Sequence, residues 1–484
     1  MSLSAPLRRP ARFLPVVGAA LLLCGCAGLV PLENPLPIPR EPSAHGDTRS
    51  LAGSPGAAWP SDGWWAEYGD RQLSGLIEEA LTGTPDIAAA KARLERARAA
   101  ASASRSALLP SVDARGKFDL ERQSKHYLIP EPAVPQGWND AGTLSLDVAW
   151  EIDFWGKNRA ALAAAASEAR AAEAEAAAAR LLVSSAVASA YAEFARLEAE
   201  RGAIRDALEV RRRTLSLIEG RVAQSLENDG ARDRARSAEA VSRAQLAEVE
   251  EQIALSRNHL AALVGAGPDR GLKITSPRPS GARFNALPER VPLDLIGRRP
   301  DIAAALMRVE ATAARIDVAK AAFYPNINLV GVLGFQSLGV DRLTTPGSIF
   351  GSVGPALSLP IFRAGRLVAD QTAAEASYAE AVAIYDGSVL RGLRDVADSV
   401  AAKRHLRKRL AAMSAAAGSA EKAWTVESDR YKGGLGTYLQ VLSAEEALIE
   451  SRRAMASLRA RAFALDIQMI RALGGGYRHK EKAS

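Results

Sequence analysis

Two stretches of the chain change from a helical to a strand-like pattern of apolar residues after the same interval. Apolar residues recur every three or four positions after Pro85 and again after Pro300, which predicts a helix in each stretch. The helical pattern stops at Pro110 in the first stretch and at Pro325 in the second, and apolar and polar residues then alternate. The chain therefore contains an internal repeat in which a helix leads directly into a strand.

Each of these strands is followed by a second strand, so the pattern predicts two β-hairpins. The predicted strands are 111–121, 143–153, 326–335 and 349–361. A segment of about ten residues with one apolar and one polar face has the length and alternation of a transmembrane β-strand. A soluble sheet with one buried face would show the same alternation, so the pattern alone leaves both interpretations open.

After each hairpin the helical pattern continues for more than sixty residues. The predicted helices run from about 157 to 227 and from about 366 to 430, and each then turns into an antiparallel helix that ends near Leu263 or Leu473. A helix of this length spans roughly 100 Å at about 1.5 Å per residue. No globular core needs such a helix, so these segments are typical of coiled-coil struts.

The two hairpins and their helices divide the chain into two similar halves of mixed α and β structure. We predict a first repeat over 63–270, which contains the hairpin 111–153, and a second repeat over 271–476, which contains the hairpin 326–361. Residues 477–484 form a short tail. Arg221 matches Arg430 and Gly265 matches Gly474 at one common offset, which keeps the long helical hairpins of the two repeats in register.

The N-terminus has the features of a lipoprotein leader. Three arginines precede an apolar run from Phe13 to Leu23, which is too short to span a bilayer as a stable helix. The following Cys24-Gly25-Cys26 resembles a bacterial lipobox, in which Gly25 favours Cys26 over Cys24 as the lipidated residue. We expect a signal peptide over 1–25, a lipidated extended arm over 26–62, and no cofactor besides the lipid on Cys26. Cleavage as an ordinary secreted protein is the alternative.

Charge and candidate chemistry change this picture little. The net charge of +7 comes partly from the leader, and most other charges alternate in sign along helices, which is typical of solvated surface and not of a nucleic-acid partner. The basic run 403–409 is interpreted in the same way. The histidines show no metal-ligand spacing, and no P-loop, HExxH, CxxC or GxSxG motif is present. The sequence therefore predicts neither a metal site nor an enzyme.

Several stretches resemble the outer-membrane efflux protein family, the TolC-like outer-membrane factors, and in particular its lipoprotein branch that serves resistance-nodulation-division pumps. The matching stretches are 148–156, 295–302, 323–327, 354–366 and 430–442. The resemblance implies a trimer in which each chain contributes four strands to a membrane β-barrel and its helices to a long α-helical coiled-coil barrel. Four strands cannot close a barrel alone, so an oligomer follows from the sequence itself. A dimer would also satisfy this requirement, and the number three rests on the resemblance.

The resemblance also places functional residues at the far ends of the long helical hairpins. Members of the family bind a periplasmic adaptor and narrow their tunnel at an Arg-Tyr-x-x-Gly-x-x-x-Tyr-Leu stretch. By position, the adaptor-docking tip comprises Arg430, Tyr431, Gly434, Thr437 and Tyr438, together with Arg221 and Gly230 near the first turn. The periplasmic gate comprises Leu439, Ser443, Glu445 and Glu446.

Two details of this assignment stay open. Related channels often have an aspartate four residues after the leucine, whereas this chain has Ser443 there. Our hypothesis is that Leu439 provides an apolar constriction and that a glutamate replaces the usual acid. Alternatively, Tyr431 and Tyr438 only pack the hairpin turn.

A group of aromatic residues lies where the predicted strands meet the helices. Its members are Trp150, Phe154, Trp155, Phe323 and Tyr324. Such rings could form an aromatic girdle at the inner interface of the bilayer, or they could simply pack the bend of the chain.

Together these features predict the exit duct of a tripartite efflux system in the outer membrane. Its expected partners are two further copies of the chain, a periplasmic adaptor, an inner-membrane pump of the resistance-nodulation-division type and outer-membrane lipid. The alternatives are the exit duct of a type I protein secretion system and a non-conducting coiled-coil lipoprotein. The substrate is not indicated by the sequence.

Overall fold

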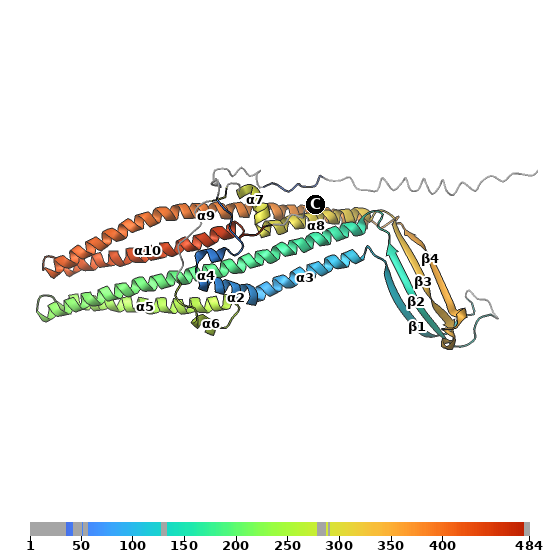
Figure 1. Cartoon of the computed structure of the whole chain (residues 1–484), viewed down its shortest axis with the longest axis horizontal. Helices are drawn as coiled ribbons and strands as arrows, with labels where there is room; N and C mark the ends of the chain where they lie inside the picture. Colours follow the sequence, from blue (N-terminus) through green and yellow to red (C-terminus); the bar gives the residue numbers. More distant parts are fainter. Residues whose placement is uncertain are drawn as a thin grey trace, which may run out of the picture. The chain divides into compact units, whose positions relative to one another are not determined.

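The computed structural model describes residues 35–41, 51, 57–126, 133–277, 287–288 and 291–478. The predicted signal peptide, Cys26 and most of the arm therefore lie outside the described residues, as does nearly all of the predicted tail. The main elements are η3 (Trp64–Tyr68), α2 (Arg71–Gly83), α3 (Pro85–Ser106), β1 (Ser111–Glu121), β2 (Asn139–Glu151), α4 (Lys157–Ala223), α5 (Asp229–Leu263), α6 (Asp269–Leu272), α7 (Val291–Arg298), α8 (Pro300–Ala321), β3 (Asn326–Leu338), η4 (Val340–Arg342), η5 (Pro346–Ser348), β4 (Ile349–Ser358), α9 (Arg366–Lys432) and α10 (Tyr438–Ala472) (Figure 1).

The predicted mixture of helices and strands is confirmed. The chain forms two compact units, which are described separately below. The sheet unit consists mainly of residues 99–167 and 309–382, and the helical unit consists mainly of residues 39–98, 168–308 and 383–484. Among the described residues, no helix is both long enough and apolar enough to cross a membrane.

The sheet unit contains one antiparallel sheet with the strand order β1-β2-β3-β4. Each predicted hairpin forms, and β2 of the first repeat pairs with β3 of the second, so that Leu146 lies opposite Leu333. Two predicted boundaries are wrong. β2 begins at Asn139 because its first residues pair with the end of β1, and β4 ends at Ser358, where pairing with Asn326 stops.

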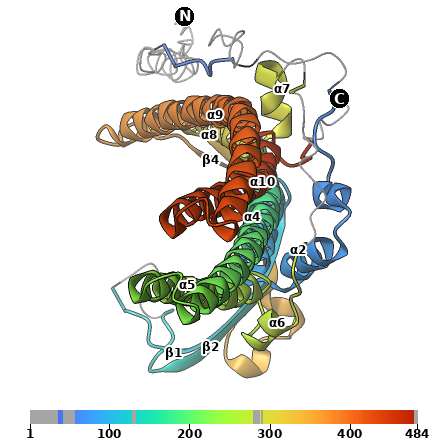
Figure 2. The same ribbon diagram turned by 90° about the vertical axis from the view of Figure 1, so that its left-hand side faces the viewer.

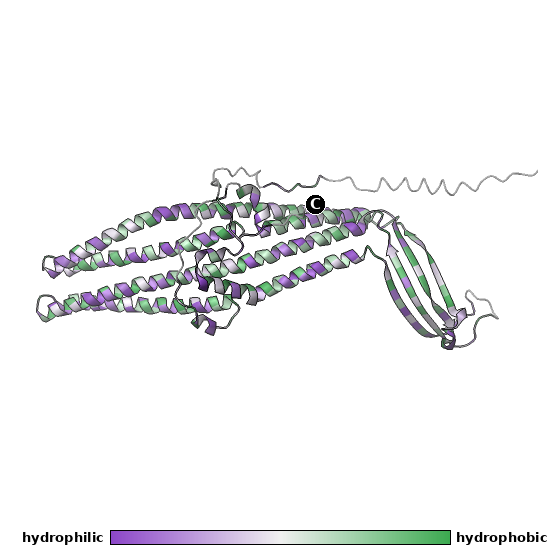
Figure 3. Ribbon diagram, viewed as in Figure 1, coloured by the Kyte–Doolittle hydropathy of each residue, from purple (hydrophilic) through white to green (hydrophobic). Residues whose placement is uncertain are grey.

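One face of this sheet is apolar and exposed. The register places Leu144, Leu146, Val148 and Trp150 of β2 beside Phe335, Leu333, Gly331 and Leu329 of β3. On the same face, Leu333 is 63% exposed and Val353 is 79% exposed. Hydrophobic residues recur along the strands in Figure 3. An apolar surface of this extent is typical of contact with lipid or with another chain.

The helical unit contains two long helical hairpins of matched length. α4 and α9 have 67 residues each, and α5 and α10 have 35 residues each. The four helices lie side by side in the order α9, α10, α4, α5 (Figures 1 and 2). The largest core cluster forms where η3 and α2 pack on these helices, and it includes Trp64, Tyr68, Leu73, Tyr191, Phe194, Leu260, Phe463 and Ile467.

A glycine after each return helix lets the repeats close on their own first helices. Gly265 (φ +80°) packs against Gly83, and Gly474 (φ +87°) packs against Arg298. A Cβ on Gly265 would lie 2.8 Å from the carbonyl oxygen of Gly83, and one on Gly474 would overlap the carbonyl oxygen of Arg298. The same left-handed glycine therefore serves equivalent junctions in both repeats.

Candidate helix-hairpin tip site

Two short turns form the ends of the long hairpins. The first turn separates Ala223 of α4 from Asp229 of α5, and the second separates Lys432 of α9 from Tyr438 of α10. The predicted position of Gly230 in the first turn is wrong, because the Asn228 side chain accepts the backbone N–H of Ala231 at 2.9 Å and starts the helix earlier.

The second turn contains the predicted tip residues and is mostly exposed. Gly434 adopts a left-handed conformation (φ +72°) that glycine tolerates without strain. The backbone N–H of Thr437 donates to the Gln440 side chain at 2.8 Å, which caps the start of α10. Arg430 is exposed and lies 3.6 Å from Glu427 of the same helix. Arg430, Gly434 and Thr437 therefore remain accessible.

The structure brings the predicted residues Arg221 and Tyr431 together and so joins the two turns. The guanidinium of Arg221 lies over the Tyr431 ring, 4.7 Å from its centre, and donates to the Tyr431 carbonyl oxygen at 3.2 Å. The Tyr431 hydroxyl donates to Glu227 at 3.2 Å. Sequence analysis missed Glu227, although its position just before the turn residues Asn228 and Asp229 was a usable signal.

Both tip tyrosines are buried. Tyr431 and Tyr438 are 2% and 5% exposed, their ring centres lie 6.3 Å apart, and they pack with Ile218 and Val441. Burial raises the pKa of Tyr431, and the charge of Glu227 raises it further. Burial also raises the pKa of Tyr438 to about 12. Both hydroxyls therefore stay protonated at neutral pH, and the rings pack the hairpin ends against each other.

The predicted gate residues divide into two groups. Leu439 is 62% exposed, and Ser443 and Glu446 are exposed on the same side of α10, because they follow it by four and seven residues. Glu445 is only 1% exposed, and it accepts a hydrogen bond from Thr214 of α4 at 3.0 Å. The assignment of Glu445 to an exposed gate is therefore wrong.

The position of Glu445 on α10 explains its burial. Glu445 follows Val441 by four residues and precedes Leu448 by three, and both of these are buried. Its carboxylate lies 3.5 Å from Arg211 of α4. Burial raises the pKa of Glu445, although the Thr214 hydrogen bond and the Arg211 charge oppose this shift. Glu445 thus joins the two hairpins near their ends.

The predicted aromatic group forms a cluster in the sheet unit. The rings of Trp155 and Tyr324 stack with centres 4.6 Å apart, and Trp155 Nε1 donates to the Pro325 carbonyl oxygen at 2.8 Å. Trp150 Nε1 donates to the Leu108 carbonyl oxygen at 3.1 Å. Phe154 is 61% exposed, whereas Phe323 is half-buried. The cluster thus combines exposed rings with satisfied polar atoms, as at a membrane interface.

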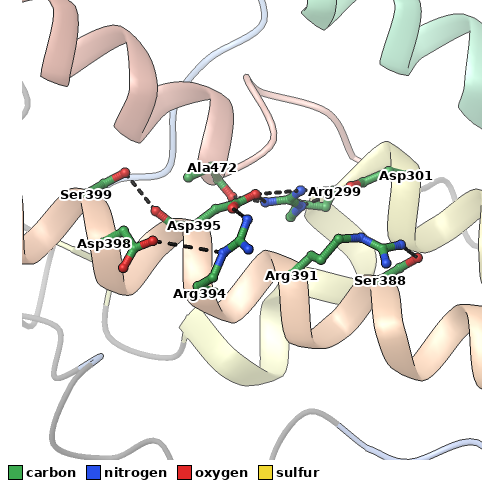
Figure 4. Close-up of polar contacts among 9 residues, drawn as sticks. All are labelled: Arg299, Asp301, Ser388, Arg391, Arg394, Asp395, Asp398, Ser399 and Ala472. Atoms are coloured by element: carbon green, nitrogen blue, oxygen red, sulfur yellow. Dashed lines mark hydrogen bonds and ion pairs between the residues drawn. The ribbon is translucent and has the colours of Figure 1, made fainter.

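Arg299 of the repeated motif has a structural role in the helical unit. Its guanidinium bonds Asp301 at 2.7 Å, Asp395 of α9 at 3.4 Å and the carbonyl oxygen of Ala472 at the end of α10 at 3.1 Å (Figure 4). Burial opposes the charge of Arg299, but the hydrogen bonds and charges of the two aspartates outweigh it and raise its pKa. Arg299 therefore connects the start of α8 to both helices of the second hairpin.

One residue of the basic run 403–409 also differs from its prediction. Lys403 donates to Asp466 at 2.9 Å, and Asp466 is 1% exposed and accepts the Tyr68 hydroxyl at 2.9 Å. The solvated-face interpretation is therefore wrong for Lys403. Within the described ranges, no three His, Cys, Asp or Glu side chains lie close enough together to bind a metal ion.

Comparison with known proteins gives consistent results. A family model described as outer membrane efflux protein matches residues 76–266 and 291–475. The chain is 35% identical over 382 residues to the fusaric acid resistance protein FusA of Burkholderia cepacia, which covers 77% of this chain and 71% of FusA. It is 28% identical over 468 residues to the pyoverdine export outer membrane protein OpmQ of Pseudomonas aeruginosa, which covers 96% of this chain and 97% of OpmQ.

A solved structure shows the same fold. The crystal structure of the outer membrane protein VceC from Vibrio cholerae matches the chain with a TM-score of 0.82 at 43% sequence identity. The match covers 87% of this chain and 100% of VceC. The likeness therefore includes both the sheet and the long helical hairpins.

Proposed function

The chain belongs to the outer membrane efflux protein family, and from this membership we propose that it is the trimeric, lipid-anchored exit duct of a tripartite efflux system. Membership makes the protein an efflux channel of the outer membrane. The trimer, the lipid anchor, the adaptor, the pump and the gate are the parts that we propose.

The exposed apolar face of the sheet is the observation that supports the trimer most directly. β1 and β4 each have an unpaired edge within the chain, because the strand order β1-β2-β3-β4 does not close. An open edge is not tolerated in hydrocarbon, where every backbone N–H and C=O must find a partner in the protein. Edges β1 and β4 of neighbouring copies would pair, and three copies would close a barrel of twelve strands.

The hairpin tips are the proposed binding site for the periplasmic adaptor. Arg430, Gly434 and Thr437 are exposed there, and the packed pair Arg221 and Tyr431 keeps the two turns at one level. We propose that the adaptor connects these tips to an inner-membrane pump of the resistance-nodulation-division type. The chain itself would conduct passively, and small organic compounds are the proposed substrate class, as the names of FusA and OpmQ suggest for those proteins.

Single-channel recording tests the channel and its proposed gate. Purified wild-type protein in planar lipid bilayers is expected to give small step currents and to run as a trimer that boiling dissociates. Leu439→Ala combined with Glu446→Ala should raise the conductance several-fold, because it removes the exposed leucine and the acid that we propose narrow the tunnel.

The control is Leu435→Ala, which removes a leucine that is 76% exposed in the neighbouring turn. Its conductance should match that of the wild type. Unchanged conductance in the double variant would contradict the proposed gate, whereas the absence of any current in the wild type would contradict the channel.

Lipidation predicts a difference between the two cysteines. Cells that express the full chain with Cys26→Ser should incorporate no labelled palmitate into the protein, because the acceptor sulfur is lost. The matched variant Cys24→Ser should be labelled like the wild type, since Cys24 would leave with the signal peptide. Label that persists in Cys26→Ser would rule out Cys26 as the anchor.

A further inference from the structure

The middle of α9 has an exposed basic segment, defined here as Arg404, Arg407, Lys408 and Arg409. None of these four residues has an ion pair within the part of the chain that the structure describes. The sequence has no acid between Asp398 and Glu421, so α9 itself cannot neutralise them. Arginines of the first hairpin do find acids within the chain, for example at 2.9 Å in both Arg205–Glu250 and Arg236–Glu219.

On the opposite edge of the four-helix layer, α5 has an acidic pair, Glu248 and Glu251. Both are exposed, and neither has an ion pair among the described residues. They face away from α4, because the intervening Val249 and the following Ile253 are buried. The flanking Val241 and Leu255 are 49% and 60% exposed.

The exposed residues of α5 follow a coiled-coil spacing. Val241, Glu248 and Leu255 are separated by seven residues each, and exposed Ala244 and Glu251 fall between them. A heptad stripe of this kind normally packs against another helix. In this chain the stripe lies on the outer edge, where no described helix adjoins it (Figures 1 and 2).

The internal repeat indicates which helix should cover this stripe. α4 and α9 are equivalent, and so are α5 and α10, since each pair has equal length. Within the chain, α4 packs against α10 through the ion pair Glu200–Arg453 at 2.6 Å. The equivalent contact would join α9 to α5, but these helices form the two opposite edges of the chain. A second copy can supply the missing helix, and such head-to-tail contacts close into rings.

The two charged groups lie at similar distances from the hairpin ends. Arg404 and Arg409 lie 28 and 23 residues before the last residue of α9, and Glu248 and Glu251 lie 19 and 22 residues after the first residue of α5. At about 1.5 Å per residue, both groups are roughly 30–40 Å from the tips. The in-chain pair Glu200 and Arg453 shows a comparable offset, at 23 and 15 residues from their helix ends.

We propose that the basic segment of α9 pairs with Glu248 and Glu251 of a neighbouring copy of this chain, and that these charges set the order of the repeats in the ring. Arg409 occupies the position equivalent to Glu200, so the sign of the charge on the long helix is inverted between the repeats. The return helices are inverted in the opposite sense, with Arg453 on α10 and the acidic pair on α5.

This inversion distinguishes correct from incorrect neighbours. Placing α4 beside α5 of another copy would bring Glu200 near the acidic pair, and placing α9 beside α10 would bring arginines together. Like charges in an interface penalise the wrong partner more than they strengthen the right one. The ring would therefore alternate first and second repeats in a fixed register. This inference rests on the proposed homotrimer.

Charge reversal of the full chain in detergent tests the pairing. Lys408→Glu with Arg409→Glu should lower the association constant of the trimer by roughly 100-fold, as expected for the loss of two surface ion pairs at each of three interfaces. Adding Glu248→Lys and Glu251→Lys to the same chain should restore it. The control Arg459→Glu with Arg461→Glu reverses two exposed, unpaired cations of α10 and should leave the trimer intact.

Cysteine cross-linking gives a second measurement that does not depend on stability. Lys408→Cys combined with Glu251→Cys should yield covalent trimers on mild oxidation, whereas either single substitution should not. Charge-reversed trimers that are as stable as the wild type, or that the compensating reversal does not restore, would overturn the pairing. In either case an intact wild-type trimer would leave the proposed channel standing, whereas a monomeric wild type would contradict the proposed function itself.

Discussion

Leu333→Arg is expected to prevent the protein from accumulating in the outer membrane. Leu333 lies near the middle of β3 on the apolar face, opposite Leu146 and Gly351, and is 63% exposed. An arginine on the lipid face near the centre of a bilayer costs about 2–4 kcal/mol. In a trimer this cost applies three times, or roughly 6–12 kcal/mol. The amount of heat-modifiable trimer in purified outer membranes measures the loss.

The neighbouring residue provides the matched control. Val332 points to the other face of the sheet, where Asp147 of β2 lies opposite it. Val332→Arg should therefore insert like the wild type, since its charge meets a carboxylate in place of lipid. Equal insertion of both variants would mean that the apolar face does not contact the membrane.

The strands were predictable because their signal is local. Successive side chains of a strand point to opposite faces, so a half-exposed strand shows its alternation directly in the sequence. The start of β2 was missed because Asn139 to Gly142 have poor strand propensity, and only their pairing with β1 makes them extended. Pairing between β2 and β3 joins residues far apart in the sequence, and no local pattern specifies it.

The candidate site was predictable in part, because the resemblance located the tips but not the direction of each side chain. Glu445 and Glu446 are adjacent glutamates, yet one is buried against Thr214 and the other is exposed. A charged residue on a surface helix is usually solvated, so Glu445 and Lys403 were expected to be exposed. Both instead have buried polar partners on other helices, and a pairing of this kind depends on tertiary contacts that composition does not reveal.

The two return glycines explain why the helix-first motif recurs in the sequence. Thr84 and Arg299 occupy matching positions, but their chemistry differs, since Thr84 donates to the Ala80 carbonyl oxygen and Arg299 forms ion pairs with Asp301 and Asp395. The backbone crossing beside them is common to both repeats, because Gly265 touches Gly83 and Gly474 touches Arg298. The repeat therefore preserves a close backbone contact rather than one side-chain interaction.

Gly474→Ala should consequently be among the most destabilising single substitutions in the chain. Its Cβ would overlap the carbonyl oxygen of Arg298, and its φ of +87° is unfavourable for alanine. Since backbone atoms on both sides must move, we expect a loss of about 4 kcal/mol or more. Gly265→Ala should cost less, because its Cβ would lie 2.8 Å from the Gly83 oxygen.

The control for this series is Gly418→Ala, in the middle of α9, where an added Cβ has no neighbour within 4 Å. Alanine is the better helix former, so this variant should gain about 1 kcal/mol. Thermal unfolding of the purified proteins in detergent, followed by circular dichroism, should rank Gly418→Ala as most stable, then Gly265→Ala, then Gly474→Ala. If Gly474→Ala unfolds at the same temperature as Gly418→Ala, the close crossing at Arg298 contributes nothing to the stability of the second repeat.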